Sequence, residues 1–381
     1  MPLIHVPGNP LVSLQLQSLL LVVLGLIVLA YKPYLDSLIH NIKACNLISR
    51  VCLTVFLLGA IASSLLAHNH LLPQTLLGGI PEYFGLAQWL SCIVLGFFIR
   101  SRLNHISSSF SITVIVSLIV LISIFAERNL ITSDFQLSGL LFQATSLAMY
   151  ACFGLAFLIG NFSTHFKNNP LLTSLIFIIL TGGVILAQSR IGLFSYALIC
   201  AVSVINRPNR SKTVLLGIGV AFMLALSIAS PQLTTRYRNE DVKQGLQYRR
   251  MIYATSTREL VEKHRILGNG AGVHPVYLNQ QKEVPADIAK DLNIGLRFAS
   301  AHDLLLDIGL MFGVLPLLIA LIAIVCSIYH YSKNMSRSSN ISLRLAFFVL
   351  LLVSFINVPS LVLTPLFIIF LISGLSERTY N

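Results

Sequence analysis

A succession of long apolar runs, interrupted once by a long polar stretch, most constrains what this chain can fold into. A transmembrane helix needs roughly 20 consecutive, mostly apolar residues, and about eleven runs approach that length. Of the 381 residues, 55% are hydrophobic and only 10% are charged, and the mean hydropathy is +0.81. Soluble domains carry roughly 25% charged residues. We therefore predict an all-α, polytopic integral membrane protein with about 11–12 transmembrane helices.

The predicted spans lie near Leu11–Tyr31, Val51–Ala67, Leu86–Ile99, Ser109–Phe125, Leu140–Ile159, Leu171–Gln188, Ile191–Ile205, Val214–Ala229, Leu304–Tyr329, Leu345–Val358 and Leu361–Leu375. The polar stretch Pro231–His302 holds eleven of the 26 Lys and Arg residues and seven of the 14 acidic residues. It divides the chain into residues 1–230 with about eight transmembrane helices, a loop of residues 231–301 with an amphipathic helix, and residues 302–381 with about three helices. We expect this loop to hold the chemistry of a membrane enzyme.

Lys and Arg residues predict the orientation, because they collect in the short cytoplasmic loops of membrane proteins. Outside the polar stretch, thirteen of them fall on one side of the predicted spans, and only Arg128 and Arg190 fall on the other. The first side is therefore expected to be cytoplasmic, which leaves the N-terminus, Arg190 and the polar stretch on the opposite side. The N-terminal sequence MPLIHVPGNP has no Lys or Arg, and the apolar run after it is too long for a signal-peptide core, so we expect no cleaved signal.

The net charge of +12 does not indicate a nucleic-acid partner, because the basic residues are scattered between apolar runs without a basic cluster or zinc-ligand spacing. The six cysteines lie in or beside apolar runs, and no CxxC pair occurs. We interpret them as small core residues and expect no disulfide.

Arg190, in AQSRIGLFSY, lies between two predicted spans with almost no loop to carry it away from the membrane. A charge at that depth costs several kcal/mol unless it is paired or faces water, which makes Arg190 a functional candidate. The alternative is an arginine whose guanidinium extends to the lipid headgroups.

The polar stretch contains a predicted amphipathic helix, because Val242–His264 has no proline and its single glycine lies near the start. At 100° per residue, one narrow apolar stripe collects Val242, Leu246, Arg249, Tyr253 and Leu260. Arg249 on that stripe needs an anionic partner, whereas Arg250 lies about a quarter-turn away. The alternative is an interfacial helix with solvated Arg250, Arg258, Lys263 and Arg265. The following GNGAG (Gly268–Gly272) lacks the GxGxxG and GKS patterns, so we predict a tight turn and no nucleotide site.

His302 opens the segment AHDLLLDIGLMFG at the boundary between the polar stretch and a predicted span. Its pKa lies near neutrality, so its imidazole could accept a proton from a hydroxyl, although a lone histidine at a helix start is often structural. Asp303 and Asp307 form an i,i+4 pair that would repel unless one carboxyl binds a cation, pairs with an arginine or takes a proton. We expect no metal and no other cofactor; a metal site of His302, Asp303 and Asp307 is the weaker alternative. Glu82, just before the third span, could pair with one of the arginines.

Two arginines, Arg190 and Arg249, and one histidine, His302, are thus expected at the same outer face of the helix bundle. Paired guanidinium groups match the geometry of phosphate, and a nearby base activates an acceptor hydroxyl. This combination indicates displacement of a lipid diphosphate leaving group.

Three motifs in this order resemble the O-antigen ligase and polymerase family of bacterial envelope glycosyltransferases. They are QSR at Gln188–Arg190, RRMIY…HRILGNGAG at Arg249–Gly272, and AHDLLLDIGLMFG at Ala301–Gly313. With the loop and the hydropathy, the resemblance covers the chain from about Leu140 to its end. It implies a GT-C-like membrane fold that transfers a glycan from undecaprenyl diphosphate, without a nucleotide sugar, at the periplasmic face of the bacterial inner membrane.

The resemblance also implies residue roles. Arg190 and Arg249 would hold the donor diphosphate, and His302 would be the general base on the acceptor hydroxyl in one inverting, metal-independent displacement. The family's Arg-x3-aromatic and His-x3-Leu-x6-Gly patterns are filled by Arg249 with Tyr253 and by His302 with Leu306 and Gly313. Two features depart from the family. Asp303 stands where relatives often have Asn or Ser, which would raise the basicity of the imidazole, and about eleven spans are predicted where the family commonly has an even number.

We expect an O-antigen ligase with lipid A–core as acceptor, because the chain is compact with one dominant loop. A polysaccharide polymerase, which extends a growing glycan, is the next alternative, followed by a protein O-oligosaccharyltransferase. A glycolipid flippase or transporter would place its charges near mid-membrane, whereas the candidate charges here lie at one outer boundary. A purely structural membrane protein would give no reason for an arginine on the apolar stripe.

Overall fold

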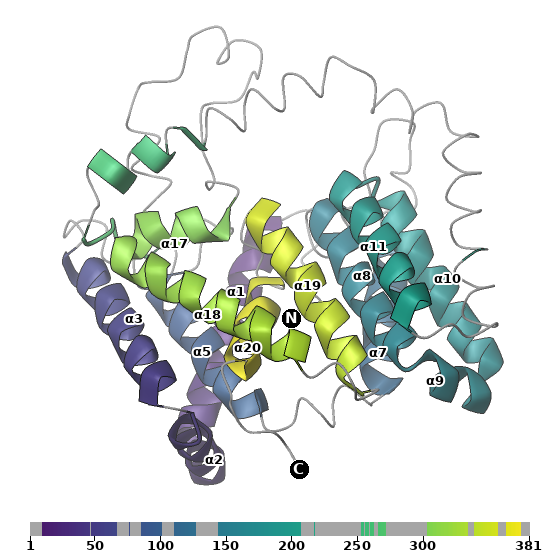
Figure 1. The fold of residues 1–381 in the computed structure, drawn as a ribbon, viewed down its shortest axis with the longest axis horizontal. Coiled ribbons are helices and arrows are strands. Elements are labelled where there is room, and N and C mark those ends of the chain that lie inside the picture. Colours follow the sequence, from purple (N-terminus) through teal and green to yellow (C-terminus); the bar gives the residue numbers. More distant parts are fainter. Residues whose placement is uncertain are drawn as a thin grey trace, which may run out of the picture. The chain divides into compact units, whose positions relative to one another are not determined.

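The computed structural model (Figure 1) describes residues 10–45, 47–66, 85–100, 110–126, 144–206, 303–333, 339–356 and 363–374, and residues 76 and 217. Within the polar stretch it describes residues 253–254, 256–258, 260–262 and 266–271. In chain order, the helices of these ranges are α1 (Pro10–Ala30), α2 (Lys32–Lys43), α3 (Leu47–Leu66), α5 (Leu86–Arg100), α7 (Phe110–Ala126), α8 (Ala144–Gly160), α9 (Phe162–Asn168), α10 (Pro170–Leu186), α11 (Arg190–Asn206), α17 (Leu304–Phe312), α18 (Val314–Lys333), α19 (Ser339–Ile356) and α20 (Leu363–Gly374).

The predicted spans coincide with these helices, except Val214–Ala229, which lies outside the described residues apart from Gly217. Among the described residues, Leu47–Leu66 and Val314–Ser332 are each long and apolar enough to cross a membrane, and α1 with α2 would be a third such span if counted as one bent pair. The remaining apolar helices have 10–17 residues. No strand occurs in the described part of the chain, so the predicted all-α, polytopic membrane fold is confirmed.

The prediction of a single span at Leu304–Tyr329 is wrong, because the chain breaks at Gly313 between α17 and α18. The φ angle of Gly313 is +97°, a conformation that glycine adopts without the steric cost of a side chain. The apolar pattern continues through the break, so hydropathy alone does not reveal it.

The amphipathic helix α2 is also absent from the predicted elements. It follows α1 after a bend of 89°, and Pro33 in its first turn suits a helix start. Its buried Asn41 donates a hydrogen bond of 2.7 Å from Nδ2 to the carbonyl of Phe97 on α5. This bond anchors a mostly polar helix to the apolar bundle.

The chain forms two compact units, which do not follow the linear order of the sequence. The first unit contains 1–10, 101–241 and 331–353, and the second contains 11–100, 242–330 and 354–381.

In the first unit, α8 is the central helix, and its side chains from Ser146 to Ile159 are buried. Helices α7, α10 and α11 pack around it (Figure 1). A Cβ on Gly154 of α8 would lie only 2.6 Å from Cγ1 of Val116 on α7. Small residues at such crossings let two backbones approach closely, which is how helices associate in lipid.

In the second unit, α5 packs against α20, α2 and α3. The ring of Phe312, at the end of α17, is fully buried and meets Phe56 of α3 and Trp89 of α5 edge-on, with ring centroids 5.8 and 5.6 Å apart. These aromatic contacts hold the C-terminal end of α17 against both helices.

Candidate functional site

The QSR motif forms the tight connection between α10 and α11. Helix α10 ends at Leu186, and Gln188 adopts a left-handed conformation with φ +50° before α11 begins at Arg190. Helices commonly end with such a residue, but glycine is the usual choice because a side chain is strained there. The prediction that almost no loop separates Arg190 from its two spans is confirmed.

Ser189 caps the N-terminus of α11. Its carbonyl accepts a hydrogen bond of 2.9 Å from the Leu193 N–H, and its hydroxyl accepts one of 3.4 Å from the Gly192 N–H. The same hydroxyl donates to Oγ1 of Thr145 on α8 at 3.4 Å. Arg190 is therefore the first residue of a capped helix, where the helix dipole produces a positive potential.

Asp303 is the N-cap of α17. Its Oδ1 accepts hydrogen bonds from the N–H groups of Leu305 and Leu306, at 2.8 and 3.2 Å. Burial raises the pKa of the Asp303 carboxyl above its ordinary value, although the two amide hydrogen bonds act in the opposite direction. Asp is a good N-cap, as Asn and Ser are, so the capping role of this residue does not require a charged side chain.

Asp307, one turn further along α17, is only 2% exposed. The Asp303 carboxylate accepts hydrogen bonds from amides of its own helix, whereas Asp307 is buried. Among the described residues, no three His, Cys, Asp or Glu side chains form a group that could hold a metal ion.

Residues 253–262 of the polar stretch form a helical segment, here called the loop helix, described except at positions 255 and 259. Ser256 and Leu260 are buried and Tyr253 is half-buried, while Arg258 is exposed and pairs with Glu262 at 3.1 Å. The prediction of solvated basic residues on the polar face is confirmed for Arg258.

The buried face of the loop helix packs against α17 and α18. The side chain of Leu260 forms one apolar cluster with Leu306, Leu310, Val314 and Leu317. A Cβ on Gly309 would lie 3.0 Å from Cδ2 of Leu260, so a glycine allows this close packing. The predicted apolar stripe is thus confirmed at Leu260.

The GNGAG sequence forms the predicted turn, described through Ala271, and it lies against the end of α17. A Cβ on Gly268 would collide with the carbonyl of Met311, and Gly270 has a φ of +90°. The Gly268 N–H donates to Oγ of Ser63 at 3.2 Å, and the Ala271 N–H donates to Oγ of Ser64 at 3.3 Å. Two adjacent serines of α3 therefore bind the turn.

The last four carbonyls of α17, at residues 309–312, all accept hydrogen bonds although the helix stops there. The donors are the N–H groups of Gly313, Asn269 and Gly270, at 2.8, 2.9 and 2.8 Å, and the hydroxyl of Ser63, at 3.0 Å. A helix end normally leaves four carbonyls without partners, and an unpaired carbonyl in a membrane is costly. The turn and α3 therefore stabilise the break after α17.

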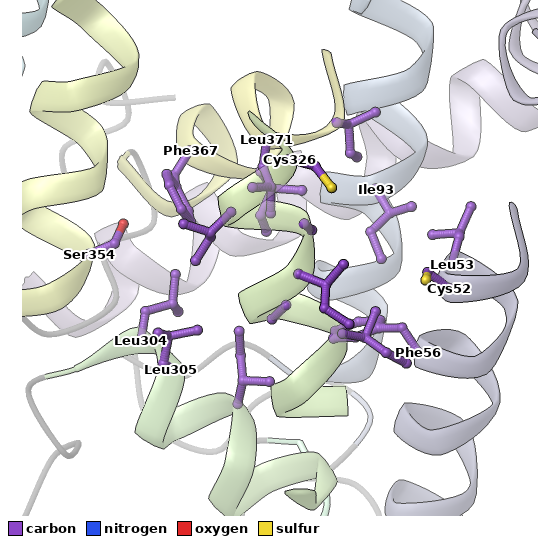
Figure 2. A pocket seen from close by; sticks show the side chains of 18 of the residues that line it. Cys52, Leu53, Phe56, Ile93, Leu304, Leu305, Cys326, Ser354, Phe367 and Leu371 are labelled. Carbon is purple, nitrogen blue, oxygen red and sulfur yellow. The ribbon is translucent and has the colours of Figure 1, made fainter. Parts of the chain in front are cut away.

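An apolar recess lies within the second unit, between α3, α5, α17, α18, α20 and the end of α19 (Figure 2). It encloses about 1000 Å³ of space free of protein atoms, part of it open to the surroundings, and none of the 22 described residues that line it carries a charge. Leu304 and Leu305, directly after Asp303, line one end, and Phe56 and Cys52 of α3 lie across from them (Figure 2). The lining residue Ile48 is 71% exposed, so the recess opens onto the outer surface of α3.

Two of the six thiols depart from the prediction of core cysteines. Cys326 is exposed and Cys52 is half-buried, and both line the recess, whereas the other four cysteines are buried.

Several predicted site residues lie outside the described part of the chain: Glu82, Arg249, Arg250 and His302. Arg190 belongs to the first unit, and Tyr253, Asp303 and Asp307 belong to the second. Sequence reasoning missed the left-handed conformation of Gln188, the roles of Ser63 and Ser64, and the recess. A glutamine in the sequence does not indicate a positive φ. Two adjacent serines in an apolar run do not reveal what they bind, but a polar pair within a predicted span is a signal that could have drawn attention to Ser63 and Ser64.

Comparisons with known proteins give one result. Residues 175–321 match the model of a family described as O-antigen ligase, in a segment that extends from α10 into α18 and includes the polar stretch. No curated protein and no solved structure matches the chain.

Proposed function

We propose that this chain, whose residues 175–321 match the O-antigen ligase family model, transfers a glycan from undecaprenyl diphosphate to lipid A–core. The protein is a multi-pass membrane protein of glycosyltransferase-like type. The proposal places it in the bacterial inner membrane with its active site at the periplasmic face, as the distribution of Lys and Arg indicates.

One observation carries the proposal. The matched segment contains Arg190, Arg249 and His302, the three residues that residue chemistry and helix periodicity single out independently. The segment also contains the described elements next to these residues in the sequence: the capped start of α11, the loop helix and α17.

In the proposed reaction, the acceptor hydroxyl attacks the anomeric carbon of the donor glycan. A new bond forms between the acceptor oxygen and that carbon, and the bond between the carbon and the phosphate oxygen breaks with inversion. Undecaprenyl diphosphate leaves with the electron pair, and the proton of the hydroxyl passes to the imidazole of His302. Arg190 and Arg249 stabilise the charge on the leaving diphosphate, so no metal is required.

The described neighbours of these residues support the roles. Arg190 begins a capped helix, and helix N-termini favour bound phosphate. In the loop helix, the buried face passes through Ser256 and Leu260, and the same periodicity continued back by one turn favours Arg249 over Arg250 on that face. Asp303 fixes the start of α17 immediately after His302, which supports a defined position for the base.

The recess supports a lipid-linked donor. Its uncharged lining suits a hydrocarbon chain. Leu304 and Leu305 line it next to Asp303, so a chain in the recess would have its diphosphate end near the start of α17.

The test is deletion of the gene in its host, with lipopolysaccharide separated on a gel and the gene returned as wild type or as His302→Ala. We expect the deletion and the His302→Ala strain to lose all long-chain material and to accumulate undecaprenyl-linked polymer. Core bearing a single repeat unit would instead show a polymerase. An unchanged ladder would contradict both and direct attention to glycoproteins or to lipid transport.

Matched variants separate chemistry from folding. His40→Ala on α2 and Arg258→Ala on the exposed face of the loop helix remove the same residue types at exposed positions, and both strains should keep wild-type ladders. Arg190→Ala and Arg249→Ala should abolish transfer while membrane levels of the protein stay unchanged. Normal transfer by Arg249→Ala would contradict the site assignment.

A further inference from the structure

We propose that Ser63 of α3 is a positioning residue for the transfer reaction, because its hydroxyl fixes the helix that begins directly after His302. This inference rests on the proposed function, since it assigns Ser63 a role in that reaction. Ser63 lies outside residues 175–321, so the family match does not include it.

The hydroxyl of Ser63 makes two hydrogen bonds at once. It donates to the carbonyl of Phe312, the last residue of α17, at 3.0 Å, and it accepts from the N–H of Gly268 at 3.2 Å. One side chain therefore joins three segments that are far apart in sequence: α3, the GNGAG turn and α17. The residue is fully buried, so no water replaces either bond without rearrangement.

The position of this bridge explains why it matters for the reaction. The loop helix, the turn and α17 form one packed group through Leu260 and the two hydrogen bonds that the Asn269 and Gly270 N–H groups donate to α17. Two serine hydroxyls, those of Ser63 and Ser64, tie that group to α3 by side-chain hydrogen bonds. In the sequence, the proposed diphosphate ligand Arg249 precedes the loop helix and the proposed base His302 precedes α17, so both residues adjoin this group.

Helix α17 is short enough to act as one rigid body. Nine residues span about 14 Å at 1.5 Å per residue, so a displacement at Phe312 is carried to Asp303. Displacing reacting groups by about 1 Å lowers a rate on the order of 100-fold. Loss of the Ser63 hydroxyl should therefore lower turnover without removing any group that contacts the substrate.

Ser64 provides the internal comparison. It is also fully buried on α3, and its hydroxyl accepts one hydrogen bond from the turn, the Ala271 N–H at 3.3 Å. The Phe312 carbonyl is bound by Ser63, so removal of the Ser64 hydroxyl loosens the turn but leaves that carbonyl bound.

The experiment compares Ser63→Ala, Ser63→Thr, Ser64→Ala and Thr54→Ala in purified, full-length protein reconstituted into proteoliposomes with undecaprenyl-diphosphate-linked glycan and lipid A–core. Thr54 is a matched control, because its hydroxyl bonds only the Arg50 carbonyl of its own helix, at 2.9 Å. The measurements are kcat and KM per folded molecule, and hydrogen exchange of the amides in residues 304–313.

We expect kcat of Ser63→Ala to fall by roughly 10- to 100-fold with a nearly unchanged KM for the donor, and Ser63→Thr to restore it. Ser64→Ala and Thr54→Ala should stay within roughly two-fold of wild type, as substitutions away from the site do. Exchange in residues 304–313 should become faster in Ser63→Ala only.

Wild-type kcat in Ser63→Ala, or an equal loss in Ser64→Ala, would overturn the positioning role. Hydrogen exchange keeps this result separate from a failure of the proposed function. If His302→Ala transfers normally while exchange still accelerates in Ser63→Ala, the bridge exists but the assigned reaction is wrong. If His302→Ala is inactive while Ser63→Ala has wild-type kinetics and wild-type hydrogen exchange, the proposed reaction is supported and the positioning role of Ser63 is contradicted.

Discussion

The N–H of Gly270 in the polar stretch donates a hydrogen bond of 2.8 Å to the carbonyl of Met311 near the end of α17. This pair joins a predicted loop to a helix that the apolar pattern had merged with the next one. The consequence is a broken helix. Backbone N–H groups of the loop donate to carbonyls of α17 that would accept from the next turn if the helix continued. The break gives the chain a short separate helix directly after His302.

Gly313→Ala should destabilise the protein strongly. Its φ of +97° is strained for any side chain, and a Cβ would collide with the carbonyl of Ile266, so a loss of about 2 kcal/mol or more is expected. The measurement is the midpoint of thermal unfolding in detergent. Gly182→Ala is the control, because nothing lies within 4 Å of its added Cβ and alanine favours a helix interior by roughly 0.5–1 kcal/mol. An equal effect of both changes would contradict the explanation.

Asp303→Ala should lose the cap of α17, at a cost of about 1 kcal/mol, whereas Asp303→Asn should keep it. Both variants are compared by thermal unfolding and by transfer rate. Full transfer by Asp303→Asn would show that capping is the property needed at this position. Loss of transfer in a stable Asp303→Asn would instead assign the carboxylate a direct part in the chemistry.

Stability should also depend on pH through Asp303. Its folded pKa is raised above the ordinary value of 3.8, so the folded state favours the protonated form. The contribution to stability is therefore present below 3.8 and is lost as the pH rises through the folded pKa. Unfolding midpoints measured across the acid range should show this fall in wild type and a weaker fall in Asp303→Asn. Identical profiles would contradict the raised pKa.

Gln188→Gly should leave the protein at least as stable as wild type, because glycine adopts a φ of +50° without strain. Gln188→Val should destabilise it by about 1–2 kcal/mol, since a branched side chain is poorly accommodated in that conformation. Unfolding midpoints of the two variants test this. If Gln188→Gly is stable but transfers slowly, the glutamine side chain itself takes part beside Arg190.

Thiol labelling should report occupation of the recess. Cys52 and Cys326 line it and are accessible, whereas the other four cysteines are buried, so a maleimide should modify these two first. Undecaprenyl phosphate should slow the modification of Cys326, and a phospholipid at equal concentration should slow it less. Mass spectrometry of peptides gives the site and the rate. Equal protection by both lipids would remove the recess as support for a polyprenyl donor.

The amino-acid sequence by itself determined the class of fold and several local features. Burial in hydrocarbon requires continuous apolar helices, so composition and run length predicted the all-α membrane protein and nearly every described helix. The position of Arg190 between two spans and the buried side of Leu260 were also predicted, because turn length and helical periodicity involve neighbouring residues only.

Tertiary structure decided the rest. The break at Gly313 depends on hydrogen-bond donors from Ser63 and from residues 269–270. These residues are distant in sequence, so the apolar run around Gly313 does not predict the break. That Oδ1 of Asp303 accepts hydrogen bonds from the amides of Leu305 and Leu306 was likewise evident only in the tertiary structure. The recess likewise arises only where six separate helices meet. Hydropathy and periodicity are properties of each segment, whereas caps, breaks and cavities depend on which segments pack together.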